Sequence, residues 1–166
     1  MTHPRVEESL PRADGAGSSV LVRLSVGDDR YALPLAHVRE VVRMVAVAPL
    51  PDAPPGVVGV INLRGRVIPV ISLRARVGLP PKEPSLSDRI VVAEDGGRVF
   101  GLLVDGVHGV AAVGRVEAQS LAGGPGEARP ASVAIVDGDP VPILDPATLQ
   151  EPRAGAPSPQ RPERPR

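Results

Sequence analysis

This chain has no cysteine, no tryptophan and only two aromatic residues, Tyr31 and Phe100, among its 166 residues. Without cysteine, a disulfide scaffold and a cysteine-ligated zinc site are excluded. The charges produce no strong net field, because 19 acidic residues balance 19 basic ones. A nucleic-acid binder needs a basic groove with stacking aromatics, so we expect no nucleic-acid partner. No apolar run approaches the roughly 20 residues that cross a bilayer, so we expect no direct membrane insertion.

Both ends of the chain are predicted to be tails. Residues 1–18 are polar, show no periodicity and lack the apolar core of a signal peptide, which favours a cytoplasmic location. Residues 150–166 combine prolines and arginines with almost nothing to bury. Such segments cannot offset the entropy of folding, so we expect both to be disordered. The folded unit is then 19–149, a length that suits one domain or two small lobes.

The stretch Val57–Leu73 is the most informative part of what is present. Two runs of Val and Ile flank the tetrad Asn62-Leu63-Arg64-Gly65. Branched aliphatic residues favour strands, and Gly65 tolerates the positive φ that a tight hairpin requires. Arg64 is therefore predicted to project from the tip of a rigid hairpin, where its guanidinium can pair with a carboxylate.

The chain also repeats itself. Segment 30–41 aligns with 99–110 at an offset of 69 residues, and segment 67–71 aligns with 140–144 at an offset of 73. The matched pairs include the two aromatic residues: Tyr31 with Phe100, Leu33 with Leu102, Leu35 with Val104, Val38 with Val107, Val41 with Val110, and Pro69 with Pro142. Each half is therefore predicted as strand, turn, strand, short bend and a hairpin that ends on a proline-containing strand.

Many short strands with turns between them indicate an all-β fold. We predict two small antiparallel barrels of five strands each, one from about 19–75 and the other from about 89–149. With so few aromatics, Val, Leu and Ile fill their interiors, each contributing about 1.5–3 kcal/mol on burial. Because one barrel of this size is marginal alone, the two should share an interface, with Tyr31 and Phe100 at equivalent, mostly buried sites.

Local signals predict two further features. Proline cannot donate to a sheet ladder, so the strands that contain Pro69 and Pro142 are expected at edges or bulges. Helix is expected only as short turns at 73–77 and at 146–149, the second with Asp145 as its N-cap.

The sequence shows no convincing catalytic constellation, and we expect no enzyme activity, no cofactor and no metal. His37 and His108 lie at roughly equivalent places in the repeat, without an accompanying acidic cluster. A small β-barrel enzyme stays open as an alternative, and a deep pocket lined by His37, Glu40 or His108 would favour it. A motif that would activate a serine, such as Gly-x-Ser-x-Gly, is absent.

Four segments closely resemble the CheW family of chemotaxis coupling proteins: 31–42, 49–54, 58–74 and 101–107. The motif Asn-Leu-Arg-Gly-x-x-x-Pro-Val after Gly-Val-Ile is the most specific of these. The resemblance covers about 19–149 and implies a CheW-like domain of two SH3-like five-stranded barrels. It implies a non-catalytic adaptor that joins chemoreceptor cytoplasmic tips to the regulatory domain of a CheA-type histidine kinase. An interaction module of another two-component or motility-type pathway is the alternative.

The resemblance also implies which residues bind partners. The predicted contact residues are Val38, Glu40, Val41, Val42, Gly59, Asn62, Leu63, Arg64, Gly65, Val91 and Val92. Among them, Glu40 and Arg64 are predicted to approach within salt-bridge distance, and Val91 and Val92 to form a strand edge that contacts the kinase. The chain departs from the family pattern at Ser72 and Gly109, where acids are usual, and at His108 and 114–131. Which receptor, kinase and cellular output it serves stays open.

Overall fold

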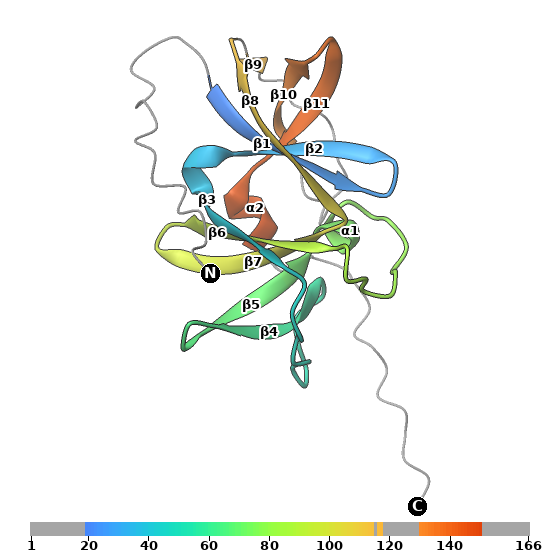
Figure 1. The fold of residues 1–166 in the computed structure, drawn as a ribbon, viewed down its shortest axis with the longest axis vertical. Coiled ribbons are helices and arrows are strands. Elements are labelled where there is room, and N and C mark those ends of the chain that lie inside the picture. Colours follow the sequence, from blue (N-terminus) through green and yellow to red (C-terminus); the bar gives the residue numbers. More distant parts are fainter. Residues whose placement is uncertain (1–18, 115, 118–129, 151–166) are drawn as a thin grey trace, which may run out of the picture.

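The computed structural model describes residues 19–114, 116–117 and 130–150. They form two small β-barrels, one above the other in Figure 1, with a short helix between them. The predicted all-β fold is therefore confirmed. The expected tails, apart from Gln150, lie outside the described residues. None of the helices in this part of the chain is long and apolar enough to cross a membrane.

We call the upper barrel barrel A and the lower one barrel B. Barrel A has the strand order β8-β1-β2-β11-β10-β9, and barrel B has the order β3-β6-β7-β5-β4. The strands of barrel A are β1 (Ser19–Val26), β2 (Asp29–Pro34), β8 (Gly106–Val113), β9 (Val116–Glu117), β10 (Pro130–Val136) and β11 (Asp139–Leu144). Those of barrel B are β3 (Val38–Arg43), β4 (Val57–Leu63), β5 (Arg66–Ser72), β6 (Arg89–Asp95) and β7 (Arg98–Val104).

Three apolar clusters hold the molecule together. One fills barrel A around Leu21, Ala134 and Ile143, and a second fills barrel B around Ile61 and Ile90. The third and largest cluster takes strands from both barrels and lies between them. Because side chains alternate along a strand, β6 contributes to two clusters and is buried on both faces. The expected shared interface is confirmed.

The predicted division of the chain into barrels is wrong. Barrel B is one continuous stretch from Val38 to Val104, and barrel A is assembled from β1 and β2 at one end of the described chain and β8 to β11 at the other. The two repeats are real but exchange strands. The hairpin β1–β2 pairs in parallel with β11 from the other repeat, and β6–β7 pairs in parallel with β5. A repeat identifies which segments are equivalent and leaves open which of them pair.

The register shows how closely the two repeats correspond. Val70 pairs with Gly101 in barrel B, and Ile143 pairs with Ala32 in barrel A, which matches both sequence offsets. Phe100 is 1% exposed, whereas Tyr31 is only partly buried, and both lie against the cluster between the barrels. The equivalent placement of the two rings is confirmed; Phe100 is fully buried, and Tyr31 is partly buried.

The prolines were expected on edge strands or at bulges, and neither strand is an edge, because β5 and β11 are each flanked on both sides. Each strand does pair across a register shift, in the ladders β4–β5 and β10–β11. On β5, Pro69 is opposite Val60, whose N–H and C=O both bond to Ala48 on the far side of β4. Val60 and Pro69 are therefore a non-hydrogen-bonded pair, and the parallel register with β7 begins only at Val70. A strand can thus hold proline away from an edge where no ladder bond needs its N–H.

The short helices follow the capping residues. Helix α1 (Leu73–Arg76) begins after Ser72, whose Oγ accepts a hydrogen bond from Ala75 N–H at 3.2 Å. Helix α2 (Pro146–Gln150) begins after Asp145, whose Oδ1 accepts one from Ala147 N–H at 3.0 Å. Between Leu35 and His37 the chain makes one 3-10 turn, after which β3 starts. That turn is where the chain leaves barrel A for barrel B.

Candidate binding cleft

The predicted hairpin is present, with β4 and β5 joined by the two-residue turn Arg64-Gly65. Both turn residues have positive φ, 51° for Arg64 and 82° for Gly65, which matches the twist of the flanking strands. The side chain of Asn62 closes the turn, because its Oδ1 accepts a hydrogen bond from Gly65 N–H at 2.9 Å. Arg64 is thereby held at the tip of a rigid hairpin.

The predicted pair of Glu40 and Arg64 is also present. Arg64 Nη2 donates to Glu40 Oε2 at 2.8 Å, and the side chains are 72% and 24% exposed respectively. Glu40 comes from β3 and Arg64 from the β4–β5 turn, so the pair bridges two non-adjacent strands of barrel B. At this exposure the ion pair contributes about 0–1 kcal/mol to folding. Its position on the surface is therefore more significant than its effect on stability.

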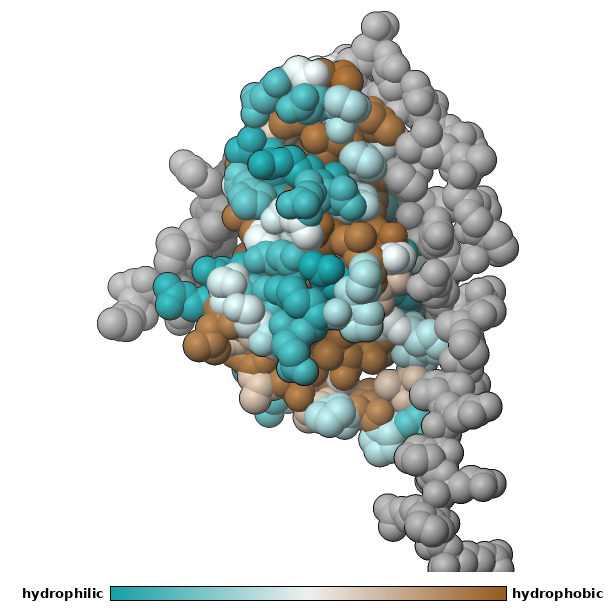
Figure 2. Space-filling view, turned by 90° about the vertical axis from the view of Figure 1, so that its right-hand side faces the viewer, coloured by the Kyte–Doolittle hydropathy of each residue, from teal (hydrophilic) through white to brown (hydrophobic). Residues whose placement is uncertain are grey.

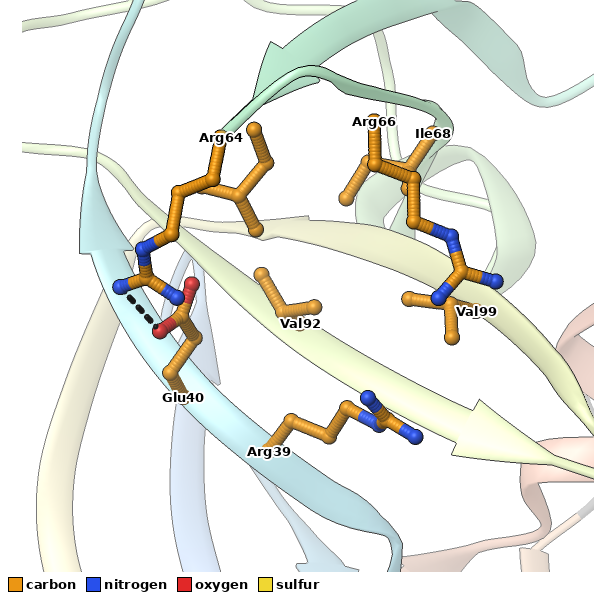
Figure 3. A pocket seen from close by; sticks show the side chains of 8 residues that line it. Arg39, Glu40, Arg64, Arg66, Ile68, Val92 and Val99 are labelled. Atoms are coloured by element: carbon orange, nitrogen blue, oxygen red, sulfur yellow. Dashed lines mark hydrogen bonds and ion pairs between the residues drawn. The ribbon is translucent and has the colours of Figure 1, made fainter.

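The pair stands at one side of an open cleft of about 460 Å³ on barrel B. Apolar side chains form its floor, and three guanidinium groups stand around its rim (Figure 3). The lining residues are Arg39, Glu40, Leu63, Arg64, Arg66, Ile68, Val92 and Val99. Among these, Arg39 forms an ion pair with Glu94 on β6.

The structure brings together only some of the predicted contact residues. Glu40, Leu63, Arg64 and Val92 line the cleft. Asn62 and Gly65 shape its hairpin. Three others lie on β3 with different surroundings: Val38 packs against the cluster between the barrels, Val42 packs against the interior of barrel B, and Val41 is 41% exposed.

The prediction that Val91 and Val92 form an exposed strand edge is wrong. Strand β6 is flanked by β3 and β7, and the two side chains are 0% and 1% exposed. Val91 belongs to the cluster between the barrels, and Val92 is the floor of the cleft. A run of branched apolar residues fits a doubly buried strand as well as an edge, so the sequence could not separate the two.

Gly59 has a structural reason to be glycine. A Cβ built there would lie 2.2 Å from Ala48 O, within the backbone bridge that joins Ala48 to Val60. The position is buried, so Gly59 acts through the packing of β4 and not as an exposed side of the cleft. At Gly65, in contrast, a Cβ would meet nothing within 4 Å, and the need for glycine comes from φ alone.

Sequence reasoning missed four lining residues: Arg39, Arg66, Ile68 and Val99. Arg66 and Ile68 could have been found, because residues two apart on a strand share a face. Arg39 and Val99 could not, since their approach depends on β3, β6 and β7 being neighbours. That order follows from the strand exchange.

A second cleft, of about 550 Å³, lies beneath the segment that leads from α1 to β6. Its polar end is an ion network in which Asp105 Oδ2 accepts from Gly27 N–H at 2.7 Å and from Arg74 Nη2 at 3.2 Å. Lys82 Nζ lies 2.9 Å from Asp88 and 3.5 Å from Asp105. The network links β1–β2 of barrel A to α1 and to the segment before β6. The side of the molecule that carries α1 faces the reader in Figure 2, and its middle is hydrophilic.

This network shifts the pKa values of two of its members, Asp105 and Lys82. Burial acts to raise the pKa of Asp105, but the hydrogen bond from Gly27 and the charges of Lys82 and Arg74 outweigh it and hold that pKa below its ordinary value. The pKa of Lys82 is raised, chiefly by its hydrogen bond to Asp88. Both shifts favour the charged forms, so the network is an ionic link between the barrels at neutral pH.

The two histidines in the described part of the chain lie apart and have different neighbours. His37 Nδ1 lies 3.1 Å from Glu94 O, and His108 Nε2 lies 2.8 Å from Ser25 Oγ. Neither lines the cleft that holds Glu40 or the cleft beside α1. Within the described ranges, no three His, Asp or Glu side chains gather closely enough to hold a metal ion.

Comparison with known proteins decides the family. The model of the CheW-like domain matches residues 20–152, nearly all of the folded unit. The chain belongs to the CheW-like family. The crystal structure of the scaffolding protein TtCheW from Thermoanaerobacter tengcongensis matches with a TM-score of 0.70 and 32% identity, over 76% of this chain and 88% of that one. The same two-barrel architecture is therefore present in a solved CheW structure.

Two CheW relatives are similar in sequence. The chemotaxis protein CheW of Rhizobium meliloti is 40% identical over 97 residues, and the probable chemotaxis protein CheW of Rhizobium etli is 37% identical over 97 residues. Each alignment covers 58% of this chain and 63% of the relative. The chain thus matches somewhat less than two thirds of the length of these CheW relatives.

Proposed function

We propose that this protein is a non-catalytic adaptor that couples chemoreceptors to a CheA-type histidine kinase in chemosensory signalling. In this role it binds the cytoplasmic tip of a receptor and the regulatory domain of the kinase at the same time. It acts in the cytoplasm, associated with the membrane through receptor arrays. The mechanism is geometric: the adaptor fixes two partners in register, so that a receptor shift biases the kinase equilibrium.

The observation that carries this proposal is the Glu40–Arg64 pair on the surface of barrel B. Both residues belong to motifs that resemble the family, and their ion pair stands beside an apolar cleft. A charged anchor next to apolar surface is the usual composition of a protein–protein contact. Val41, 41% exposed, is an apolar side chain on the opposite face of β3 from Glu40.

A binding experiment with purified components tests the proposal. The full chain is immobilised and mixed with a receptor cytoplasmic domain, a kinase regulatory domain, or both. We expect each to be captured alone and both to be captured together. Capture of neither partner would refute the coupling function.

Two matched variants locate the contact. Arg64→Ala and Val41→Asp change exposed residues of barrel B and should weaken capture of at least one partner, by roughly 1–3 kcal/mol for Arg64→Ala. Asp137→Ala changes the equivalent turn position of barrel A and should leave capture unchanged. Equal loss in all three variants would place the contact elsewhere.

A further inference from the structure

The chemistry of the barrel B cleft points to what kind of segment it takes. Its floor is aliphatic, with Val92 at 1% exposure and Ile68 also at 1%, and Leu63 and Val99 form half-buried walls. Because Val92 and Ile68 are already buried, the apolar area left for a partner is that of the walls Leu63 and Val99. This area suits one aliphatic side chain, because burying apolar area provides most of the attraction in a protein contact.

The charges around the rim do not cancel. Arg39 is paired with Glu94, and Arg64 is paired with Glu40. The side chain of Arg66 is exposed and makes no ion pair or hydrogen bond with any described residue. Figure 3 shows its guanidinium extending over the cleft on the side of Val99, away from the Glu40–Arg64 pair. The cleft therefore offers one uncompensated cation beside an apolar floor.

Glu40 adds a second requirement. Its Oε2 receives Arg64, but its Oε1 is buried and has no hydrogen-bond partner. A buried acceptor without a donor is costly, so a segment that brings an N–H group to this oxygen gains affinity. Arg64, which is 72% exposed at the hairpin tip, is the side chain that would move to admit it.

We propose that this cleft binds a segment of a partner protein in which an aliphatic side chain is adjacent to a carboxylate. The aliphatic group packs between Leu63 and Val99, the carboxylate pairs with Arg66, and a donor from the segment reaches Glu40 Oε1. This inference rests on the proposed adaptor function and deepens it, because it states the chemistry that the cleft selects. It also assigns a role to Arg66, which the family motif did not single out.

The test uses the full chain with methyl-labelled Val, Leu and Ile and three synthetic peptides. The peptides share a central Leu and differ only in its neighbours, which are Glu, Gln or Lys. We expect the Glu peptide to shift the methyl signals of Leu63 and Val99 in NMR titrations, with an affinity roughly tenfold above that of the Lys peptide. Added salt should reduce this preference.

Variants attribute the preference to Arg66. Arg66→Glu should lower the affinity for the Glu peptide roughly tenfold and should remove or reverse the preference over the Lys peptide. Arg43→Glu is the matched control, because it changes the net charge by the same amount as Arg66→Glu. Arg43 is exposed on β3 and does not line the cleft. It should leave both affinities unchanged.

Three outcomes would overturn the inference: no methyl shift with any peptide, equal affinity for all three, or no effect of Arg66→Glu. Shifts of the same methyl groups when the protein alone is concentrated would make a second copy the occupant and would also overturn it. If the wild-type chain captures receptor and kinase but shows no preference for the Glu peptide, this inference fails alone. If it shows the preference but captures neither partner, the proposed function fails alone.

Discussion

The two barrels place different side chains at equivalent positions of the repeat, and the two side chains have different surroundings. Val92 of barrel B corresponds to Arg23 of barrel A, since Val92 pairs with Gly101 and Arg23 with Ala32. Val92 is short and buried, and it lies at the floor of the cleft. Arg23 instead reaches both sides of its barrel, with Nη1 at 3.2 Å from Asp137 Oδ2 and Nη2 at 2.8 Å from His108 O. One difference within the repeat thus places a cleft floor in barrel B and an internal hydrogen-bonded link in barrel A.

The turns show the same divergence. Arg64-Gly65 in barrel B corresponds to Asp137-Gly138 in barrel A, and the φ values agree closely, 51° and 82° against 51° and 86°. The backbone is conserved between the repeats while the charge at the tip is reversed. Both pairs stay within one barrel, but Arg64 pairs with Glu40 on β3, whereas Asp137 pairs with Arg23 on β1, the counterpart of β6. Shared backbone geometry therefore does not imply shared partners.

The largest expected effect comes from placing a charge on the floor of the open cleft. Val92→Asp puts a carboxylate at a position that is 1% exposed and surrounded by Ile68 and Ile90. We expect a loss of about 3–5 kcal/mol in the free energy of unfolding, measured by urea denaturation. Arg23→Asp at the equivalent position should cost less, because the Arg23 side chain is 32% exposed and a carboxylate there keeps access to water. Equal losses in the two variants would show that the two positions tolerate a carboxylate equally badly.

Gly59→Ala should be the next most damaging change. The added methyl would lie 2.2 Å from Ala48 O, so the bridge between Ala48 and Val60 must open or shift. We expect a loss of about 3 kcal/mol in urea denaturation. Gly65→Ala, where the space is open and only the φ of 82° is unfavourable, should lose about 1 kcal/mol. A larger loss for Gly65→Ala than for Gly59→Ala would contradict the close approach of Gly59 to Ala48 O.

Arg23→Ala tests the internal tie of barrel A. It removes the hydrogen bond to His108 O and the exposed pair with Asp137, and the expected loss is about 1 kcal/mol. Asp137→Ala removes only the exposed pair, since Asp137 is 83% exposed, and should cost less. Differential scanning calorimetry of both variants measures the difference. A larger loss for Asp137→Ala would show that the ion pair, and not the carbonyl contact, is the main tie.

Acid should loosen the junction between the barrels. The pKa of Asp105 is lower in the folded state than its ordinary value of 3.8, so its contribution to stability is present above that value and is lost as pH falls through the folded pKa. The stability difference between the wild type and Asp105→Asn should therefore be constant near neutral pH and shrink below pH 3.8. Urea denaturation of both proteins across this range measures it. A difference that does not change with pH would show that the lowered pKa of Asp105 does not contribute to stability.

The smallest expected change in stability is that of Arg64→Ala. The pair with Glu40 contributes about 0–1 kcal/mol, and the left-handed φ of Arg64 is unfavourable for alanine as well. We expect the melting temperature to be nearly unchanged while partner capture weakens. A large loss of stability with intact capture would assign the pair to folding alone.

Local chemistry was predictable from the sequence, and pairing was not. The β4–β5 turn, the caps Ser72 and Asp145, and the Glu40–Arg64 contact depend on short-range rules or on a specific motif. The destination of β1–β2 depends on β11, more than 100 residues away, and a repeat of similar hairpins is compatible with either pairing. The burial of Val91 and Val92 followed from this, because only the true strand order encloses β6 on both sides.

The discontinuity of barrel A has a consequence for the order in which the protein is made. During synthesis, every strand of barrel B has emerged once Val104 has left the ribosome, and this barrel can close while the chain is still growing. The first hairpin, by contrast, must wait for β11, which ends at Leu144. Until then its Leu21 and Ala32 have no interior to enter. The barrel that begins the polypeptide is therefore the last to be completed, and a nascent chain passes through a stage with one finished barrel and one unpaired hairpin.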